Sequence, residues 1–247
     1  MTEFEVLPGE TCEELGCGDL VLFQAKKGFR FGTDAVLLAD FAAACPSERT
    51  LDLCCGNGIV PMLLSHKTAA KKIFGLEIQR DAYEMSQRSV AANRLEGRVE
   101  LVCGDLREAE KFFPRRSFSL VTCNPPYMKP GGAKLSEHSA KMIARHEIMC
   151  TLDDVVRAAA ALLADGGHFC MVHRPARLVD IFCTMRKYEI EPKRMRLVLP
   201  RAGEKPMLVL IDGLWRGGCE LAVLPPLVLY NEDGSETDEV KKIYERS

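Results

Sequence analysis

Between residues 50 and 187, short apolar segments alternate with helix-forming segments. Strands that alternate with helices form a parallel sheet whose two faces are covered by the helices. The predicted strands span 50–54, 71–78, 98–105, 117–126 and 168–173, and the predicted helices between them span 58–67, 79–95 and 152–164. A helix opened by Pro175 is predicted to run to about Lys187. The pattern therefore predicts an α/β chain with a doubly wound, Rossmann-like sheet.

The final two apolar segments, 195–200 and 206–215, break this alternation. The loop between them is too short for a helical crossover, so the two strands should pair antiparallel as a hairpin. The expected architecture is a mostly parallel seven-stranded sheet with an antiparallel C-terminal hairpin. We expect three regions: a short N-terminal extension with a cap helix (1–45), the sheet domain (46–230) and an acidic C-terminal tail (231–247).

Composition limits the partners and the location of the chain. The net charge is −2, so any contact with nucleic acid needs a local basic patch, and the basic run within 186–205 is either such a patch or solvated surface. Eleven cysteines without a Cys-x-x-Cys pair favour free thiols in a reducing compartment over disulfides or zinc. No signal peptide and no membrane-spanning segment is recognised. We expect a soluble cytoplasmic protein without a metal or a membrane, as a monomer or weak dimer.

A glycine-containing turn follows the first strand of this pattern. Gly56 and Gly58 lie between that strand and the next helix, where glycine permits a tight turn and lets a ligand approach the backbone. Glu77 ends the second strand, the position at which a Rossmann-like fold presents an acid to ribose hydroxyls. These positions predict a nucleoside-binding site at the carboxyl edge of the sheet.

Three further positions indicate which nucleoside binds. A dinucleotide fingerprint needs a third glycine where this chain has Pro61. Asp52 leads into the turn and can attract an ammonium group, directly or through water, and Asp105 ends the third strand, where it can accept from an adenine amino group. This set fits S-adenosyl-L-methionine better than a dinucleotide.

The tetrapeptide Asn124-Pro125-Pro126-Tyr127 ends the fourth strand. The residues before the two prolines are held extended, and the prolines donate no main-chain hydrogen bond to a neighbouring strand. The Asn124 side-chain oxygen and the Pro125 carbonyl can then accept from the two protons of a planar NH2 group, and Tyr127 offers a stacking face. The tetrapeptide therefore predicts a site that methylates a planar amine, with Asn124 also close to the cofactor.

With "DLCCGNG" (52–58), the tetrapeptide resembles class I methyltransferases that modify planar exocyclic amines. "QAKKGFRFGTDAVLLADFA" (24–42), "ARHE" (144–147) and "HRPARLVDI" (173–181) are similar to the bacterial tRNA adenine-N6 methyltransferases that act beside the anticodon, at position 37, of a valine tRNA. The resemblance extends from about Gln24 to about Leu210. It implies an adenosine in tRNA as the substrate.

The resemblance also assigns residues outside the central motifs. It implies that Arg30, Thr33 and Asp34 lie near the methionine end of the cofactor, and Thr33 is a good N-cap for a helix from Asp34 to Ala44. Alternatively, this helix only covers the sheet. Residues 128–150 would form a mobile lid whose basic side chains contact RNA phosphates or lie in solvent; of these, Lys129 and Arg145, with Pro126 and Tyr127, are the candidate substrate-binding residues.

Two other functions are compatible with the same tetrapeptide. Glutamine N5-methyltransferases of release factors and guanine N2-methyltransferases of rRNA share it, although only about 45 residues precede the first predicted strand, which is short for the helical substrate domain of the glutamine enzymes. A non-catalytic nucleotide-binding adaptor would keep the fold without methyl transfer.

Overall fold

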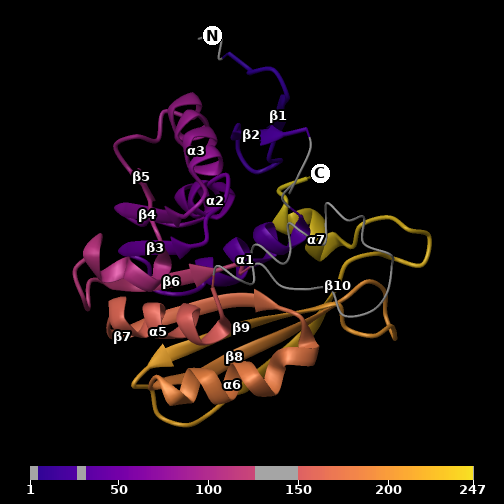
Figure 1. Cartoon of the computed structure of the whole chain (residues 1–247). Coiled ribbons are helices and arrows are strands. Elements are labelled where there is room, and N and C mark those ends of the chain that lie inside the picture. Colours follow the sequence, from indigo (N-terminus) through magenta and orange to yellow (C-terminus); the bar gives the residue numbers. More distant parts are fainter. Residues whose placement is uncertain (1–4, 27–31, 126–149, 247) are drawn as a thin grey trace, which may run out of the picture.

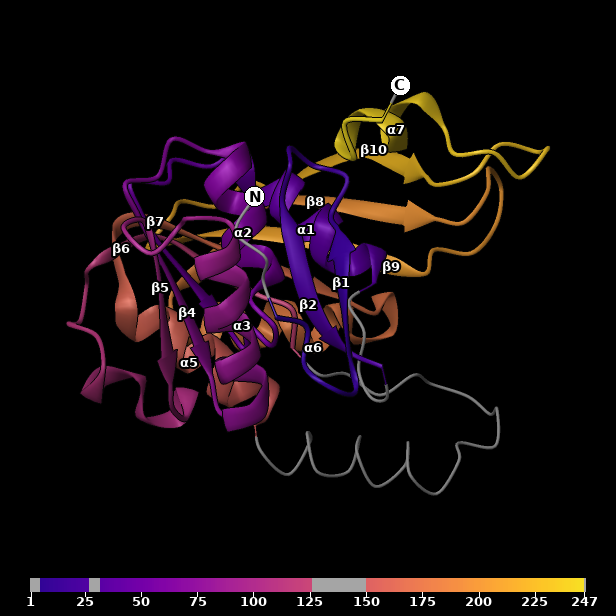
Figure 2. The same cartoon turned by 90° about the horizontal axis from the view of Figure 1, so that it is seen from above.

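The computed structural model describes residues 5–26, 32–125 and 150–246. They form one mixed sheet with helices on both faces, and a separate two-stranded hairpin near the N-terminus (Figures 1 and 2). The eight strands of the sheet lie in the order β10 (Ala222–Val228), β8 (Ile190–Leu199), β9 (Leu208–Trp215), β7 (Leu163–His173), β6 (Phe118–Cys123), β3 (Arg49–Leu53), β4 (Lys72–Glu77) and β5 (Val99–Cys103).

The pairing confirms the predicted fold class. Strands β7, β6, β3, β4 and β5 run parallel, and β9 pairs antiparallel with both β7 and β8. The sheet has one strand more than predicted, because β10 adds to its outer edge parallel to β8. This strand contains Pro225 and Pro226, which are tolerated at an edge where the register shifts between Leu224 and Leu227.

The helices divide between the two faces of the sheet. Figure 1 shows α1, α2 and α3 on one side of the sheet and α5 and α6 on the other. One hydrophobic cluster lies under α1, α2 and α3, and the other lies under α5, α6 and η1. Within the described part of the chain, no helix is both long enough and apolar enough to cross a membrane. The helices are α1 (Thr33–Ala43), α2 (Ile59–Lys67), α3 (Arg80–Ala92), α5 (Leu152–Leu162), α6 (Leu178–Lys187) and α7 (Asp238–Ile243), with 3-10 turns η1 (Leu106–Lys111) and η2 (Pro175–Arg177).

Two predicted helix boundaries have different outcomes. Thr151 caps α5 in a complete capping box with Asp154, as expected. The predicted Thr33 cap is wrong: Thr33 is the first residue of α1, and Gly32 occupies the N-cap position without a side-chain hydrogen bond. Glycine is tolerated there because its backbone reaches the extended conformation that a cap needs.

The two ends of the chain pack on the helices of the first cluster. The N-terminal hairpin of β1 (Glu10–Glu14) and β2 (Val21–Ala25) is tied to α3, where Phe23 N–H donates to Ser89 Oγ at 3.0 Å. Helix α7, inside the predicted acidic tail, buries Val240 and Ile243. Its acids occupy the first turn of the helix, where negative charge is favourable.

Candidate functional site

The loops that follow β3, β4, β5 and β6 meet at one edge of the sheet, because these four strands are parallel neighbours. Main-chain hydrogen bonds connect the loops directly. Cys55 N–H donates to the Leu76 carbonyl at 3.1 Å, and Gly104 N–H donates to the Glu77 carbonyl at 2.9 Å. The carboxyl edge therefore holds three of the predicted site segments in fixed relative positions.

The turn after β3 needs glycine for two different reasons. Gly56 and Gly58 both have positive φ, 55° and 84°, and Gly58 is the left-handed N-cap of α2. A Cβ at Gly58 would lie 3.1 Å from Ser86 Cβ, so α3 packs closely against this turn. A Cβ at Gly56 would meet nothing within 4 Å, so the backbone there is open to a ligand.

Glu77 holds this turn through its carboxylate. Oε2 accepts from Gly56 N–H at 2.8 Å, while Oε1 accepts from Gln79 N–H at 2.8 Å and from the Gln79 side chain at 3.2 Å. The residue is buried, at 4% exposure, so these donors compensate a charge removed from water. Two carboxylate oxygens accept about four hydrogen bonds, which leaves acceptor capacity for a ribose hydroxyl.

Asp52 is buried in the centre of the sheet, one residue before the end of β3. Thr122 on β6, its register partner, donates its hydroxyl to Asp52 Oδ1 at 2.6 Å. Burial raises the pKa of Asp52 to about 8, and the nearby charge of Glu77 adds to this effect while the Thr122 hydrogen bond opposes it. Asp52 is therefore mostly protonated at neutral pH.

Asp105 begins η1 as its N-cap. Its Oδ1 accepts from Arg107 N–H at 2.9 Å, and the Arg107 guanidinium contacts both carboxylate oxygens. This partner lowers the pKa of Asp105, chiefly through the side-chain hydrogen bond. Asp105 therefore remains ionised and keeps its capacity to accept a hydrogen bond from an adenine amino group.

The predicted amine-binding residues follow β6 at the same edge. Asn124 is half-buried and Pro125 is buried, directly after Cys123, whose register partner on β3 is Leu53. The ladder of β6 ends at Cys123, as expected for a strand followed by two prolines. The other members of the predicted substrate site, and most of the predicted lid, lie outside the described residues: Pro126, Tyr127, Lys129 and Arg145.

The predicted cofactor residues of the N-terminal segment are only partly described. Arg30 lies outside the described residues, whereas Thr33 and Asp34 form the first turn of α1 and are half-buried. Thr33 interacts with Tyr244, whose pKa is raised by burial and lowered in part by this hydrogen bond. The cofactor-binding role of this segment stays a prediction.

Three side chains of the edge were not identified from the sequence. Thr122, Gln79 and Arg107 each contact one of the predicted acids. Gln79 and Arg107 lie two residues after their acids, a spacing at which a side chain bonds the nearby backbone. Thr122 is 70 residues from Asp52, and only the strand register brings the two together.

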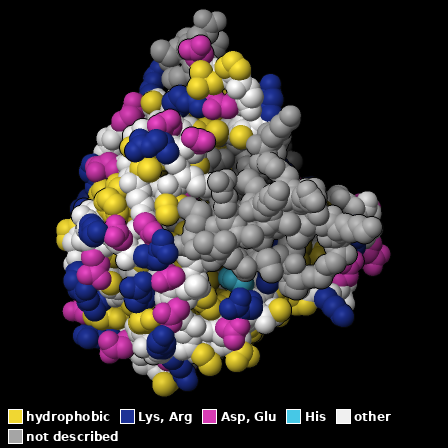
Figure 3. Space-filling view, in the orientation of Figure 1, with side chains coloured by type: hydrophobic (Ala, Val, Ile, Leu, Met, Phe, Trp, Pro, Cys, Tyr) yellow, Lys and Arg dark blue, Asp and Glu magenta, His cyan; other side chains and the backbone are white. Residues whose placement is uncertain are grey.

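The basic run within 186–205 does not form a free cationic surface. Five of its seven basic residues pair with carboxylates, which reduces their capacity to bind phosphate. Acidic and basic side chains are likewise intermixed over the face in Figure 3. The five pairs are Arg186–Glu191, Lys187–Asp153, Arg194–Asp212, Arg196–Glu239 and Arg201–Glu204.

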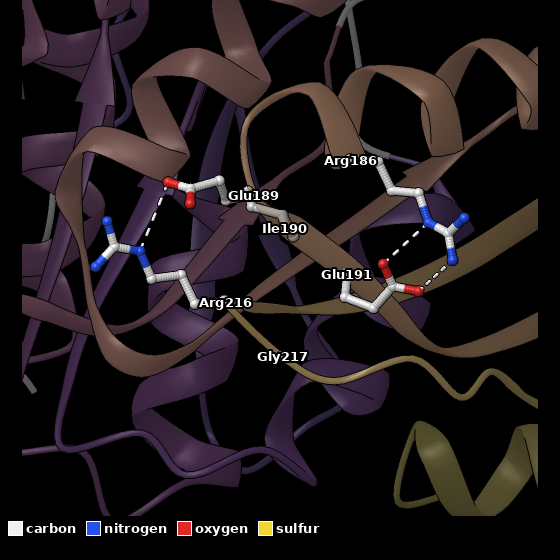
Figure 4. A pocket seen from close by; sticks show the side chains of 6 residues that line it. All are labelled: Arg186, Glu189, Ile190, Glu191, Arg216 and Gly217. Atoms are coloured by element: carbon white, nitrogen blue, oxygen red, sulfur yellow. Dashed lines mark hydrogen bonds and ion pairs between the residues drawn. The ribbon is translucent and has the colours of Figure 1, made fainter.

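A surface hollow at the end of α6 is unrelated to this edge (Figure 4). Arg186 pairs with Glu191 there, and Arg216 pairs with Glu189. The hollow lies beside the first residue of β8 and the last residue of β9, at the end of the sheet opposite to the carboxyl edge of β7. Its charges are paired with one another, so it offers no ligand-binding groups comparable to those of the edge.

Comparison with known proteins agrees with the α/β fold. Residues 23–182 match the profile of the family described as Methyltransferase small domain. A curated relative from Aeromonas hydrophila, named tRNA1(Val) (adenine(37)-N6)-methyltransferase, is 27% identical over 212 residues, which cover 85% of this chain and 86% of the relative. A relative of the same name from Porphyromonas gingivalis is 26% identical and covers 76% of this chain and 74% of its own length.

Solved structures support the fold. A predicted O-methyltransferase from Agrobacterium tumefaciens superposes with a TM-score of 0.71 at 22% identity, covering 86% of this chain and 96% of its own. TrmN from Thermus thermophilus superposes with a TM-score of 0.51 at 19% identity, covering 73% of this chain and 48% of its own. At these identities the structural likeness concerns the fold alone.

Proposed function

Because the chain belongs to the Methyltransferase small domain family, we propose that it transfers a methyl group from S-adenosyl-L-methionine to the N6 amine of an adenosine in tRNA. The observation that carries the proposal is the position of Asn124 and Pro125 at the sheet edge that also presents Gly56, Glu77 and Asp105. The names of the curated relatives support position 37 of a valine tRNA as the target. A tRNA substrate also agrees with a cytoplasmic protein.

The residues of the edge fit the cofactor. The open backbone at Gly56 leaves room for a ligand, and Glu77 retains acceptor capacity for ribose hydroxyls. Asp105 would accept from the adenine amino group. The methionine ammonium, once bound nearby, would favour the ionised form of Asp52, which is otherwise mostly protonated. When bound, S-adenosylmethionine supplies an electrophilic methyl group on a sulfonium.

Asn124 and Pro125 would act on the nucleophile. The lone pair of an aromatic amine is delocalised, so the nitrogen attacks carbon poorly while it is planar. Acceptance of its two protons by the Asn124 side-chain oxygen and the Pro125 carbonyl favours pyramidalisation and stabilises the positive charge that develops on nitrogen. Alignment of the amine with the methyl group supplies much of the remaining rate acceleration. The methylated nitrogen is cationic and therefore acidic, so water can take its proton and no strong base is required.

The position of the target base lowers the cost of recognition. A base beside the anticodon is unpaired or readily extruded, so little pairing energy is lost when it enters a pocket. Since the basic run is largely paired with acids, we propose that Lys129 and Arg145 supply phosphate contacts. Tyr127 would stack on the base, and Pro126 would line the same pocket.

The proposal is tested by finding which substrate receives a radiolabelled methyl group. The protein is incubated with labelled S-adenosylmethionine and, in separate reactions, with unmodified bulk tRNA, unmodified rRNA or a peptide release factor. We expect label in tRNA and none in the release factor. Label in the release factor alone would replace the proposal with glutamine methylation, label in rRNA but not tRNA would indicate the guanine reaction, and label in none would favour an adaptor.

A further inference from the structure

A row of polar side chains crosses the interior of the sheet at one register level. The row consists of successive register partners on β3, β6, β7, β9 and β8: Asp52, Thr122, Cys170, Asp212 and Arg194. Register partners on adjacent strands point to the same face, about 4.8 Å apart. Thr122 therefore separates Asp52 from a second buried polar cluster that the methyl-transfer site does not use.

Two thiols face each other in this cluster. Cys45 follows α1, held by a main-chain hydrogen bond to Ala42 at 2.9 Å, and its Sγ lies 3.7 Å from the Sγ of Cys170. Cys170 is fully buried, and Cys45 is 5% exposed. The S–S bond of a disulfide is about 2 Å long. The two sulfur atoms therefore need to move less than about 2 Å closer to form one.

The cluster carries charges that favour a thiolate at Cys45. Arg194 places Nη2 3.0 Å from Cys45 Sγ and donates through Nε to Asp212 Oδ2 at 2.8 Å. His168 Nδ1 lies 2.8 Å from Asp212 Oδ1, which raises the pKa of His168 to about 9. Hydrogen bonds from Cys170 and His168 lower the pKa of Cys45 to about 6 against the effect of burial. The negative carboxyl end of the α1 dipole would raise the pKa of Cys45, and these donors outweigh that effect.

We propose that Cys45 and Cys170 form an oxidisable dithiol that a peroxide converts into a disulfide joining the end of α1 to the centre of the sheet. Cys45 is the attacking thiolate, since Arg194 contacts its sulfur and it is the more accessible of the two. Cys170 is the resolving thiol, because its sulfur is 3.7 Å away. The assignment stands on this geometry and is independent of the methyl acceptor.

The reaction is balanced with peroxide as the oxidant. The Cys45 thiolate attacks one peroxide oxygen, the O–O bond breaks, and the leaving hydroxide takes a proton from the adjacent His168 imidazolium; the products are a sulfenic acid on Cys45 and water. Cys170 then attacks the Cys45 sulfur, the S–O bond breaks, and the departing hydroxide takes the Cys170 proton. Two thiols and one peroxide thus give one disulfide and two waters.

The competing interpretation is that the same donor atoms bind a metal ion. Donor atoms of Cys45, Cys170 and Asp212 all lie within 4.8 Å of one another, the only such group of three within the described residues. The Arg194 guanidinium, however, already donates to Cys45 and Asp212, so a divalent cation would have to displace an internal cation. This placement favours a thiolate over a metal site.

Differential alkylation after peroxide treatment tests the proposal on the full-length, reduced protein. We expect the free thiols to fall by at least two from the eleven of the chain, with Cys45 and Cys170 among those lost, and digestion to give a Cys45–Cys170 cross-linked peptide that dithiothreitol cleaves. In Cys170→Ser, dimedone should instead trap a sulfenic acid on Cys45. Cys17→Ser is the matched control: Cys17 is also fully buried, and its variant should still form the cross-link.

Three results would overturn the dithiol. The first is recovery of Cys45 and Cys170 as free thiols after peroxide, while exposed cysteines such as Cys183 and Cys219 are oxidised. The second is a stoichiometric metal ion in the purified protein whose removal exposes both thiols. The third is an unmodified Cys45 in Cys170→Ser with native circular dichroism. If that variant does not fold, Cys45→Ser replaces it, and a dimedone adduct on its Cys170 would refute the assigned roles.

Discussion

Replacement of Glu77 by glutamine tests how the turn after β3 is held. The carboxylate accepts from Gly56 N–H through one oxygen and from Gln79 N–H through the other, both at 2.8 Å. Glutamine offers one oxygen, so one of these N–H groups must face an NH2 group. Either the Gly56 turn or the start of α3 then loses its acceptor in a site that water barely reaches.

The magnitude follows from the lost hydrogen bonds. One hydrogen bond to a charged acceptor contributes about 1.5–3 kcal/mol, and the remaining bond weakens because its acceptor becomes neutral. Relief of the burial of a charge offsets part of this loss. We expect the free energy of unfolding to fall by about 2–3 kcal/mol and the melting temperature by roughly 4–12 °C. Affinity for S-adenosylhomocysteine should fall by about tenfold or more, since Glu77 is also the proposed acceptor for the ribose hydroxyls.

Urea denaturation and isothermal titration calorimetry measure the two effects. Glu100→Gln is the matched control, because Glu100 is half-exposed on β5 and pairs with the similarly exposed Lys72. That change should cost less than about 1 kcal/mol and leave cofactor affinity unchanged. Equal behaviour of Glu77→Gln and Glu100→Gln in both assays would refute the role assigned to Glu77.

Three other changes address separate parts of the structure. The unfolded chain releases the Asp52 proton near its ordinary pKa of 3.8 and the folded chain near 8, so Asp52 should make wild-type stability fall as pH rises between these values. In Asp52→Asn the fall should be smaller, and what remains comes from other shifted groups such as His168. Urea denaturation at about pH 5 and pH 8 measures the difference, and an equal fall in both proteins would contradict the raised pKa of Asp52. Asp105→Ala should raise KM for S-adenosylmethionine with little change in kcat, and a drop in kcat alone would contradict its assignment. Ile243→Ala should lower the free energy of unfolding by about 2–3 kcal/mol, because α7 is packed in the core; an unchanged value would mean that the C-terminal segment is dispensable.

The sequence predicted the central sheet well because its elements follow local rules. Alternation of apolar strands with helices was enough to predict the parallel strands. A loop too short for a crossover was enough to predict the β8–β9 hairpin. The same reasoning missed β10, because two prolines inside a segment argue against a strand unless it lies at an edge. It also extended the helix before β7 to residue 164 and began the next strand at residue 168, whereas α5 ends at Leu162 and β7 begins at Leu163.

The candidate site was predictable to the extent that it consists of residues at strand ends. Gly56, Glu77 and Asp105 follow neighbouring parallel strands, so their common edge follows from topology. The hydrogen bond between Thr122 and Asp52, and the Cys45–Cys170 pair, depend on register across strands distant in the chain. Register is fixed by packing of the whole sheet, which a local pattern does not contain.

Nucleoside analysis of tRNA tests the central proposal most directly. Unmodified valine tRNA is incubated with S-adenosylmethionine and either wild-type protein or Asn124→Ala, then digested and separated by mass spectrometry. The proposal predicts N6-methyladenosine from the anticodon loop, formed about 10²–10³-fold more slowly by Asn124→Ala, the effect of one lost group that stabilises developing charge. A different methylated nucleoside, or an undiminished rate in Asn124→Ala, would contradict it.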